Sequence, residues 1–170
     1  MKIFRLAVSE IVFFCAIAVS SLAFSDETST SLLFVKGLGI NANFGQMMRF
    51  VGAQTQTYRN IVCILGTGGA KHLMEQEFVP VITKYQPRWD QNLAAVWSQQ
   101  LSEVEMRSLL ELKQQSPYAS KYKAAGSQVG PAMMAASSDL LKSAVSEAVN
   151  NAWNIANTEH LKNPTTTCKL

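Results

Sequence analysis

Apolar residues in this chain recur at steps of three and four, and strict alternation of apolar and polar residues never persists. Residues 31–65 show this most clearly, with one apolar row at intervals of seven and a second row interleaved with it: Phe44, Val51, Tyr58 and Leu65, then Ile40, Met47 and Ile61. This spacing is typical of one face of an amphipathic helix. Gln54 takes one place of the second row, either as a buried residue that fixes the helix register or as a half-exposed residue at the helix edge. The pattern predicts an all-α fold.

Glycine and proline mark where the next helices are expected to end and begin. The glycine-rich stretch 66–69 follows the last apolar turn of the first helix and is expected to end it. A second helix is predicted over 70–84, with Pro80 splitting or kinking it. A third helix is expected to begin at Gln86-Pro87 and to carry Trp89 and Trp97 on one side.

A capping signal and a proline predict a corner between the next two helices. Ser102 and Glu105 have the spacing of a capping box, in which each side chain bonds the other residue's backbone N–H. Ser116 is a second N-cap candidate, and Pro117 suits the first helical position, where no N–H donor is needed. Between the two caps, an outer face and an inner face are predicted: Glu103, Arg107, Glu111 and Gln114 outside, Leu101, Val104, Leu109 and Leu112 inside.

A long last helix is predicted from Gly130-Pro131 to about Thr158. Its expected inner face has two rows with a spacing of seven: Met134, Leu141, Ala148 and Ile155, then Ser138, Val145 and Ala152. With the preceding segments, this gives a single domain of five or six helices over residues 26–170, packed as an antiparallel helical bundle.

Residues 1–25 have the parts of a secretory signal peptide that is removed by cleavage. Lys2 and Arg5 form a positive head, an apolar run covers 11–19, and small residues end the segment near Ala23 and Ser25. The run is shorter than the about 20 residues that a membrane-spanning helix needs. We therefore expect export to a bacterial periplasm; the alternatives are a membrane anchor left by an uncleaved signal and release outside the cell.

Composition limits the partners of the exported chain. Apolar residues make up 48% of the sequence and charged residues 16%, which suits a globular protein. Removal of residues 1–25 leaves a net charge of +2 with no basic stripe. This charge does not indicate a nucleic-acid partner, and no segment after the leader predicts stable membrane insertion. The oligomeric state stays open.

Two cysteines remain after the leader, Cys63 and Cys168. An even number in an oxidising compartment predicts one disulfide between them, which would tie the C-terminal tail to the body of the protein. The closed loop of about 100 residues would stabilise the fold by roughly 4–5 kcal/mol in the chain-entropy description. The alternative is two unpaired thiols.

The segment 93–137 resembles the DUF2059 family of small secreted bacterial proteins. The resemblance rests on a Leu-Ser-x-x-Glu-Met-x-x-Leu motif followed by Ser-Pro-Tyr-Ala and a lysine: Leu101, Ser102, Glu105, Met106 and Leu109, then Ser116, Pro117, Tyr118, Ala119 and Lys121. This chain has Lys113 and Gln114 where the family commonly has two aromatic residues, and Ala119 where it has glycine. The resemblance implies a largely helical protein and brings no mechanism, because the family's function is unknown.

Residue patterns for catalysis or metal binding do not form complete sets. His72 and Glu75 can share a helix face, but they supply two donors where a zinc site needs at least three protein ligands. The sequence has no Gly-x-Ser-x-Gly turn of the kind that exposes a nucleophilic serine. Gly66, Gly68 and Gly69, shortly before Lys71, allow either an anion-binding turn or a plain turn, and the plain turn is favoured. The sequence predicts neither an enzyme nor a bound cofactor or metal.

The function predicted is a non-enzymatic binding module for a protein or peptide partner in the cell envelope. The expected site is an apolar groove between the last helix and the tryptophan-bearing helix, lined by Trp89, Trp97, Met133, Met134 and Trp153. Two alternatives stay open. One is an enzyme with an unrecognised site near Lys71 and His72, and the other is a carrier of a small apolar ligand.

Overall fold

The computed structural model describes residues 29–162, and within them every regular element is a helix. The all-α prediction is therefore confirmed. The elements comprise five α-helices and two short 3₁₀ turns: α1 (Thr30–Gly37), η1 (Ile40–Ala42), α2 (Asn43–Ala53), α3 (Gln56–Ser98), α4 (Glu103–Leu112), η2 (Lys113–Gln115) and α5 (Ala119–Lys162). The predicted signal peptide, residues 1–25, and Cys168 lie outside the described residues.

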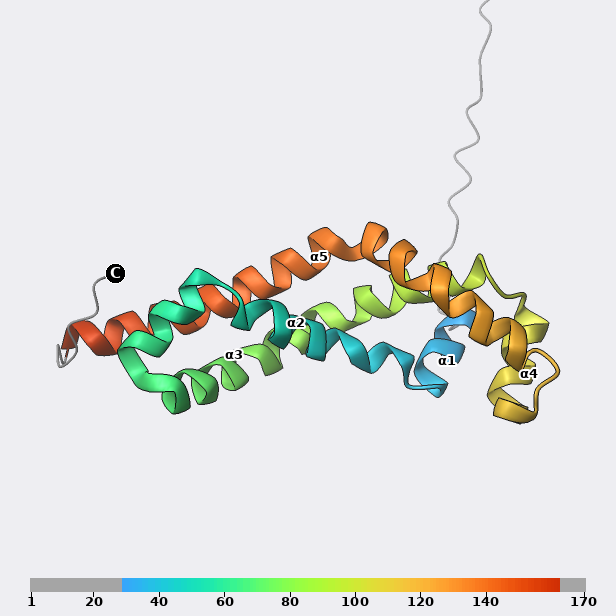
Figure 1. Cartoon of the computed structure of the whole chain (residues 1–170), viewed down its shortest axis with the longest axis horizontal. Coiled ribbons are helices and arrows are strands. Elements are labelled where there is room, and N and C mark those ends of the chain that lie inside the picture. The colour runs from blue at the N-terminus through green and yellow to red at the C-terminus, as the bar shows by residue number, and fades with distance from the viewer. Residues whose placement is uncertain (1–28, 163–170) are drawn as a thin grey trace, which may run out of the picture.

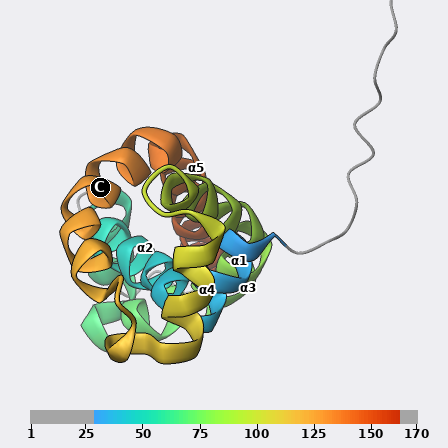
Figure 2. The same ribbon diagram turned by 90° about the vertical axis from the view of Figure 1, so that its right-hand side faces the viewer.

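The helices form an elongated antiparallel bundle of three arms (Figure 1). The first arm contains α1, α2 and the start of α3, the second contains the rest of α3, and the third is α5. Helix α4 lies across the end of the bundle where α3 finishes and α5 begins, as the end-on view also shows (Figure 2). This end brings α1, α4 and the start of α5 together.

The first arm is three helical pieces and not the single helix predicted over 31–65. Gly39 breaks it with a left-handed φ of 66°, a conformation that glycine adopts without the steric cost of a Cβ. A second break follows α2, and Thr55 caps the next helix by accepting a hydrogen bond from the Tyr58 backbone N–H at 3.1 Å. Gln54 is exposed at this break, so its reading as a buried register-fixing residue is wrong.

Gly66 reverses the chain direction inside α3, as the glycine-rich stretch predicted (Figure 1). Its φ of 70° and ψ of 168° are not helical, so residues 56–65 and 67–98 form two helices that meet at a sharp turn. The second of these, however, runs unbroken through Pro80 and Pro87. The predicted split at Pro80 and the predicted helix start at Gln86-Pro87 are therefore wrong. Both prolines are exposed, so the carbonyl groups that lose helical donors lie toward water, while neighbouring apolar residues hold the helix on the core.

Helix α5 begins at Ala119 and runs unbroken through Gly130-Pro131. The predicted helix start at Gly130-Pro131 is therefore wrong. Its buried residues recur mainly at steps of four, and they include Val129, Met133, Ser137, Leu141 and Val145. Two residues of the predicted rows, Met134 and Ile155, are 46% and 43% exposed. The other predicted positions include four buried residues, Leu141, Val145, Ala148 and Ala152, so the rows with a spacing of seven hold in the middle of the helix and fail toward its ends.

The predicted corner between α4 and α5 is confirmed. Glu105 accepts a hydrogen bond from the Ser102 N–H at 2.8 Å, and the Ser102 hydroxyl accepts one from the Glu105 N–H at 3.4 Å. Ser116 is buried, accepts from the Tyr118 N–H at 3.2 Å and bonds the Ser108 hydroxyl at 2.9 Å. The inner face of α4 differs from the prediction, since Met106 and Leu109 are buried while Val104 and Leu112 are 69% and 48% exposed.

Small residues let the first two arms approach closely. A Cβ at Gly52 of α2 would lie 2.6 Å from Cζ of Phe78 on α3, whereas a Cβ at Gly68 would meet nothing within 4 Å. We expect Gly52→Ala to lower the free energy of unfolding by about 1–3 kcal/mol, because the added methyl displaces a buried ring. Gly68→Ala is the matched control and should raise it by about 0.5–1 kcal/mol through helix propensity.

Urea denaturation followed by circular dichroism measures both variants. A Gly52→Ala protein as stable as the wild type would contradict the close packing of α2 on α3.

Candidate functional site

The predicted tryptophan–methionine groove does not exist as an open surface. Trp89, Trp97 and Met133 are 1%, 4% and 5% exposed, because α3 and α5 pack directly against each other. Met134 is exposed on α5, and Trp153 is half-buried against the core. The groove prediction is therefore wrong for its three buried members, whose side chains form the interior that a partner cannot reach.

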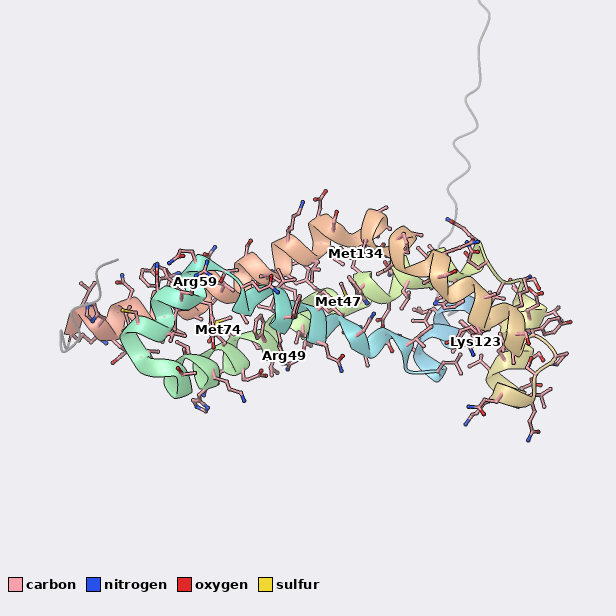
Figure 3. The ribbon with its side chains drawn as sticks, in the orientation of Figure 1. Met47, Arg49, Arg59, Met74, Lys123 and Met134 are labelled. Carbon is pink, nitrogen blue, oxygen red and sulfur yellow. The ribbon has the colours of Figure 1, made fainter. Side chains whose placement is uncertain are left out.

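A hollow with apolar and cationic lining residues lies instead at the corner where α4 meets α5. It has a volume of about 510 Å³ and is lined by Leu38, Leu109, Lys113, Gln114, Ala119, Tyr122 and Lys123. These residues come from the end of α1, from α4, from η2 and from the first turns of α5. We call it the α4 hollow; Lys123, at its edge, is labelled in Figure 3.

The floor of the α4 hollow is apolar and rigid. The Tyr122 ring stacks on Trp97, with 4.9 Å between ring centroids, and meets Phe34 edge-on at 5.8 Å. Burial raises the pKa of the Tyr122 phenol, which therefore stays neutral at ordinary pH. Leu109 is buried beside it. Such a floor favours an apolar group of a ligand.

The rim of the α4 hollow is cationic. Lys113 and Lys123 are both exposed, and neither takes part in an ion pair with any residue in the range 29–162. Their neighbour Lys121 differs, because its Nζ lies 2.7 Å from the Glu105 carboxylate. Two amines without a carboxylate partner favour an anionic ligand group.

Lys113 holds an unusual backbone conformation at this rim. Its φ is 50° and its ψ is −119°. Among residues 29–162, it is the one residue other than glycine with a positive φ. Such a conformation costs on the order of 1–3 kcal/mol for a residue with a Cβ. The capping box before α4 and the Ser116 cap before α5 fix both sides of this turn, so the fold maintains the strain.

A second hollow, of about 210 Å³, lies between α2 and α3 and is lined by Arg49, Ala53, Tyr58, Lys71, Met74, Glu75 and Phe78. We call it the α2–α3 hollow. Both carboxylate oxygens of Glu75 accept from Nε of Arg49 at 2.9 Å, an ion pair that joins the two helices. Figure 3 labels Arg49 and Met74 in this region.

The residues named for an alternative enzyme or metal site do not all line one hollow. Lys71 lines the α2–α3 hollow, while His72 is exposed and is not among its lining residues. Within residues 29–162, no group of three or more His, Cys, Asp and Glu side chains is arranged to hold a metal ion.

Cys63 lies in the part of α3 before the Gly66 turn. Its expected partner Cys168 lies outside the described residues, so the disulfide stays a prediction.

Sequence reasoning did not find either hollow. The α4 hollow joins Leu38 to residues 109–123, and the α2–α3 hollow joins residues 49–58 to residues 71–78, so no local pattern predicts which side chains meet. One signal was available: Lys113 and Gln114 stand where the DUF2059 family commonly has aromatic residues, and both line the α4 hollow.

No family model, no curated protein and no solved structure matches this chain. The resemblance of residues 93–137 to the DUF2059 family therefore stays a prediction. Over residues 29–162, no helix is long and apolar enough to cross a membrane.

Glu147 of α5 ties that helix to α3. Its carboxylate accepts from Nζ of Lys84 at 2.8 Å and from the Tyr85 hydroxyl at 2.8 Å. The hydrogen bond from Lys84, followed by the one from Tyr85, lowers the pKa of Glu147 below its ordinary value of 4.5. A carboxylate with a lowered folded-state pKa stabilises the fold above its unfolded pKa, and this contribution is lost as pH falls through the folded pKa.

We therefore expect Glu147→Gln to lower the melting temperature at pH 7, with a gap to the wild type that narrows as pH falls below 4.5. Asp139→Asn removes an exposed carboxylate from the same helix and should lower the melting temperature at pH 7 by less than Glu147→Gln does. Thermal unfolding from pH 7 to pH 3 measures both. A Glu147→Gln gap that stays constant over this range would contradict the linkage.

Proposed function

We propose that this protein is a non-enzymatic binding module for a protein or peptide partner in the cell envelope, and that the α4 hollow is its site. The hollow would take an apolar side chain of the partner on the Tyr122–Leu109 floor and neighbouring acidic groups at Lys113 and Lys123. The single observation that carries the proposal is the strained backbone of Lys113 at the rim of this hollow.

Strain at Lys113 supports a binding role because a glycine would satisfy the same turn without cost. Residues held in rare backbone conformations occur preferentially at ligand-binding and active sites. The chain keeps a long cationic side chain in that conformation, beside an apolar hollow and a second unpaired lysine. A lysine kept in a conformation that costs free energy indicates that its amine takes part in binding.

The chemistry of the rim and floor favours binding over catalysis. The polar groups that line the α4 hollow are two amines, one amide and the Tyr122 hydroxyl, on an apolar floor. The enzyme alternative has less support, because His72 does not line the hollow that contains Lys71. A carrier of a small apolar ligand is the second candidate, since the volume of about 510 Å³ lies in the range of small-molecule sites.

The proposed compartment is the periplasm, reached with a cleaved signal peptide over residues 1–25. This compartment agrees with the proposed Cys63–Cys168 disulfide, because disulfides persist in oxidising compartments. Residues 56–70 and the end of α5 lie at the same end of the molecule (Figure 1). Cys168 comes six residues after Lys162 in the sequence, and six steps of extended chain reach about 20 Å.

We expect non-reduced mature protein to take up no iodoacetamide at Cys63 or Cys168, and to take up two equivalents after reduction and unfolding. Peptide mapping of the non-reduced protein should recover one peptide that joins both cysteines. Labelling of both thiols in unreduced, unfolded protein would contradict the disulfide.

Binding at the α4 hollow is tested with ¹⁵N-labelled protein and a short peptide of sequence Glu-Phe-Glu. Amide shifts should change around Lys113, Tyr122 and Lys123, and Lys123→Gln should weaken binding about three- to tenfold. Lys142→Gln, at an exposed α5 lysine outside the hollow, is the control and should leave the affinity unchanged. Shifts confined to other surfaces would contradict the site.

Variants at Lys113 separate strain from binding. Lys113→Gly should raise the free energy of unfolding by about 1 kcal/mol, because glycine accepts positive φ, and should weaken peptide binding. Lys113→Ala should weaken binding equally without the gain in stability, because alanine keeps a Cβ. If Lys113→Gly were both more stable and unchanged in affinity, the strain would have no binding role.

Mass spectrometry of the gently purified protein under native conditions distinguishes the carrier alternative. A small apolar molecule that co-purifies and is lost on Ala119→Phe substitution, which fills the hollow and leaves the aromatic cluster in place, would favour a carrier over the peptide-binding module.

A further inference from the structure

The α2–α3 hollow repeats the chemistry of the α4 hollow. It has an apolar floor formed by Ala53, Met74 and Phe78, and cationic groups from Arg49 and Lys71 at its edge. The Tyr58 hydroxyl adds a donor. Nothing in the proposed function uses this second hollow.

Arg49 is positioned there by the packing of α2 on α3. Glu75 holds its Nε, and Gly45 leaves the space that the guanidinium occupies, because a Cβ at Gly45 would lie 2.9 Å from Nη1 of Arg49. The ion pair is only partly exposed, with 40% of the Arg49 side chain accessible. The arginine is therefore held in one orientation before any ligand arrives.

Donors remain available in the α2–α3 hollow. Hydrogen bonds between described residues use Nε of Arg49 and leave its two terminal nitrogens, while Lys71 and the Tyr58 hydroxyl make no side-chain bond within residues 29–162. Arg49 and Lys71 together exceed the single negative charge of Glu75. This arrangement suits a carboxylate next to an apolar side chain.

Each hollow has a lining residue from the first arm of the bundle. Leu38 lines the α4 hollow and Arg49 the α2–α3 hollow, and the eleven mostly helical steps from one to the other correspond to a separation of about 20 Å. Arg49 and Lys123 are visible in one view of the molecule (Figure 3). One extended segment of about six residues covers this distance.

We infer that the α2–α3 hollow is a second docking site for the same partner, so that one acidic segment with apolar anchors about 20 Å apart binds both hollows at once. This inference rests on the proposed function, since it takes the α4 hollow as the first site. Charge complementarity selects the occupant: both hollows present cations around an apolar floor, and the partner supplies acidic groups beside aromatic or aliphatic side chains.

Tandem peptides test the inference. Two Glu-Phe-Glu units are joined directly or through glycine–serine linkers of twelve or forty residues, and their affinities are compared with that of one unit. A twelve-residue linker has a root-mean-square length of about 19 Å and should bind at least tenfold more tightly than a single unit. Directly joined units place their phenylalanines three residues apart, a reach of about 10 Å that cannot span the hollows, and should gain only the twofold expected from two copies of the motif.

Two variants test whether the linker-dependent gain in affinity comes from the α2–α3 hollow. Lys71→Glu changes an exposed side chain and should abolish the linker-dependent gain while leaving single-unit binding at the α4 hollow in place. Arg49→Lys, which keeps the charge and loses the planar fork, is the second variant and should reduce the gain. Melting curves check that both proteins fold, and Lys142→Gln serves as the charge control.

The outcomes separate the two proposals. Absence of any single-unit binding at the α4 hollow would overturn the proposed function. Single-unit binding with no gain at any linker length, or a gain that Lys71→Glu leaves unchanged, would overturn this inference alone.

Discussion

The structure depends on three aromatic rings that come from three separate helices. Phe34 of α1 meets Trp97 of α3 at 5.5 Å and Tyr122 of α5 at 5.8 Å, and the Trp97 and Tyr122 rings stack at 4.9 Å. Edge-on and offset pairs of this kind stabilise a fold beyond the area they bury. The cluster fixes the end of the bundle against which α4 is placed, and its Tyr122 ring forms the floor of the α4 hollow.

Away from this cluster, the bundle is held by close contact between α3 and α5. A row of alanines with no exposed surface faces inward along α5: Ala144, Ala148, Ala152 and Ala156. Small side chains let neighbouring helix backbones approach, and the Glu147 contacts with Lys84 and Tyr85 flank the seam. These contacts hold the two long helices together along their length. The strained backbone of Lys113 lies outside them, in the short connection between α4 and α5.

Local sequence signals predicted the fold class and the corner between α4 and α5. They failed for the helix bounds and buried faces that long-range packing determines. The capping box at Ser102 and the Ser116 cap involve neighbours in sequence, so the chain itself contains the information. Pro80 predicted a split or kink, and Pro87 and Pro131 predicted helix starts, but the helices run through all three because the packed core outweighs their local cost. Periodicity showed that Trp89 and Trp97 share a helix side but not that this side is interior, and the two hollows arise only when distant segments meet.

The measurement that tests this account most directly is the set of nuclear Overhauser contacts among the rings of Phe34, Trp97 and Tyr122 in the folded protein. The account predicts cross-peaks between all three rings, because their centroids lie 4.9–5.8 Å apart. A fully helical spectrum without these cross-peaks would contradict it, since α1, α3 and α5 would then not meet where the proposed site is formed.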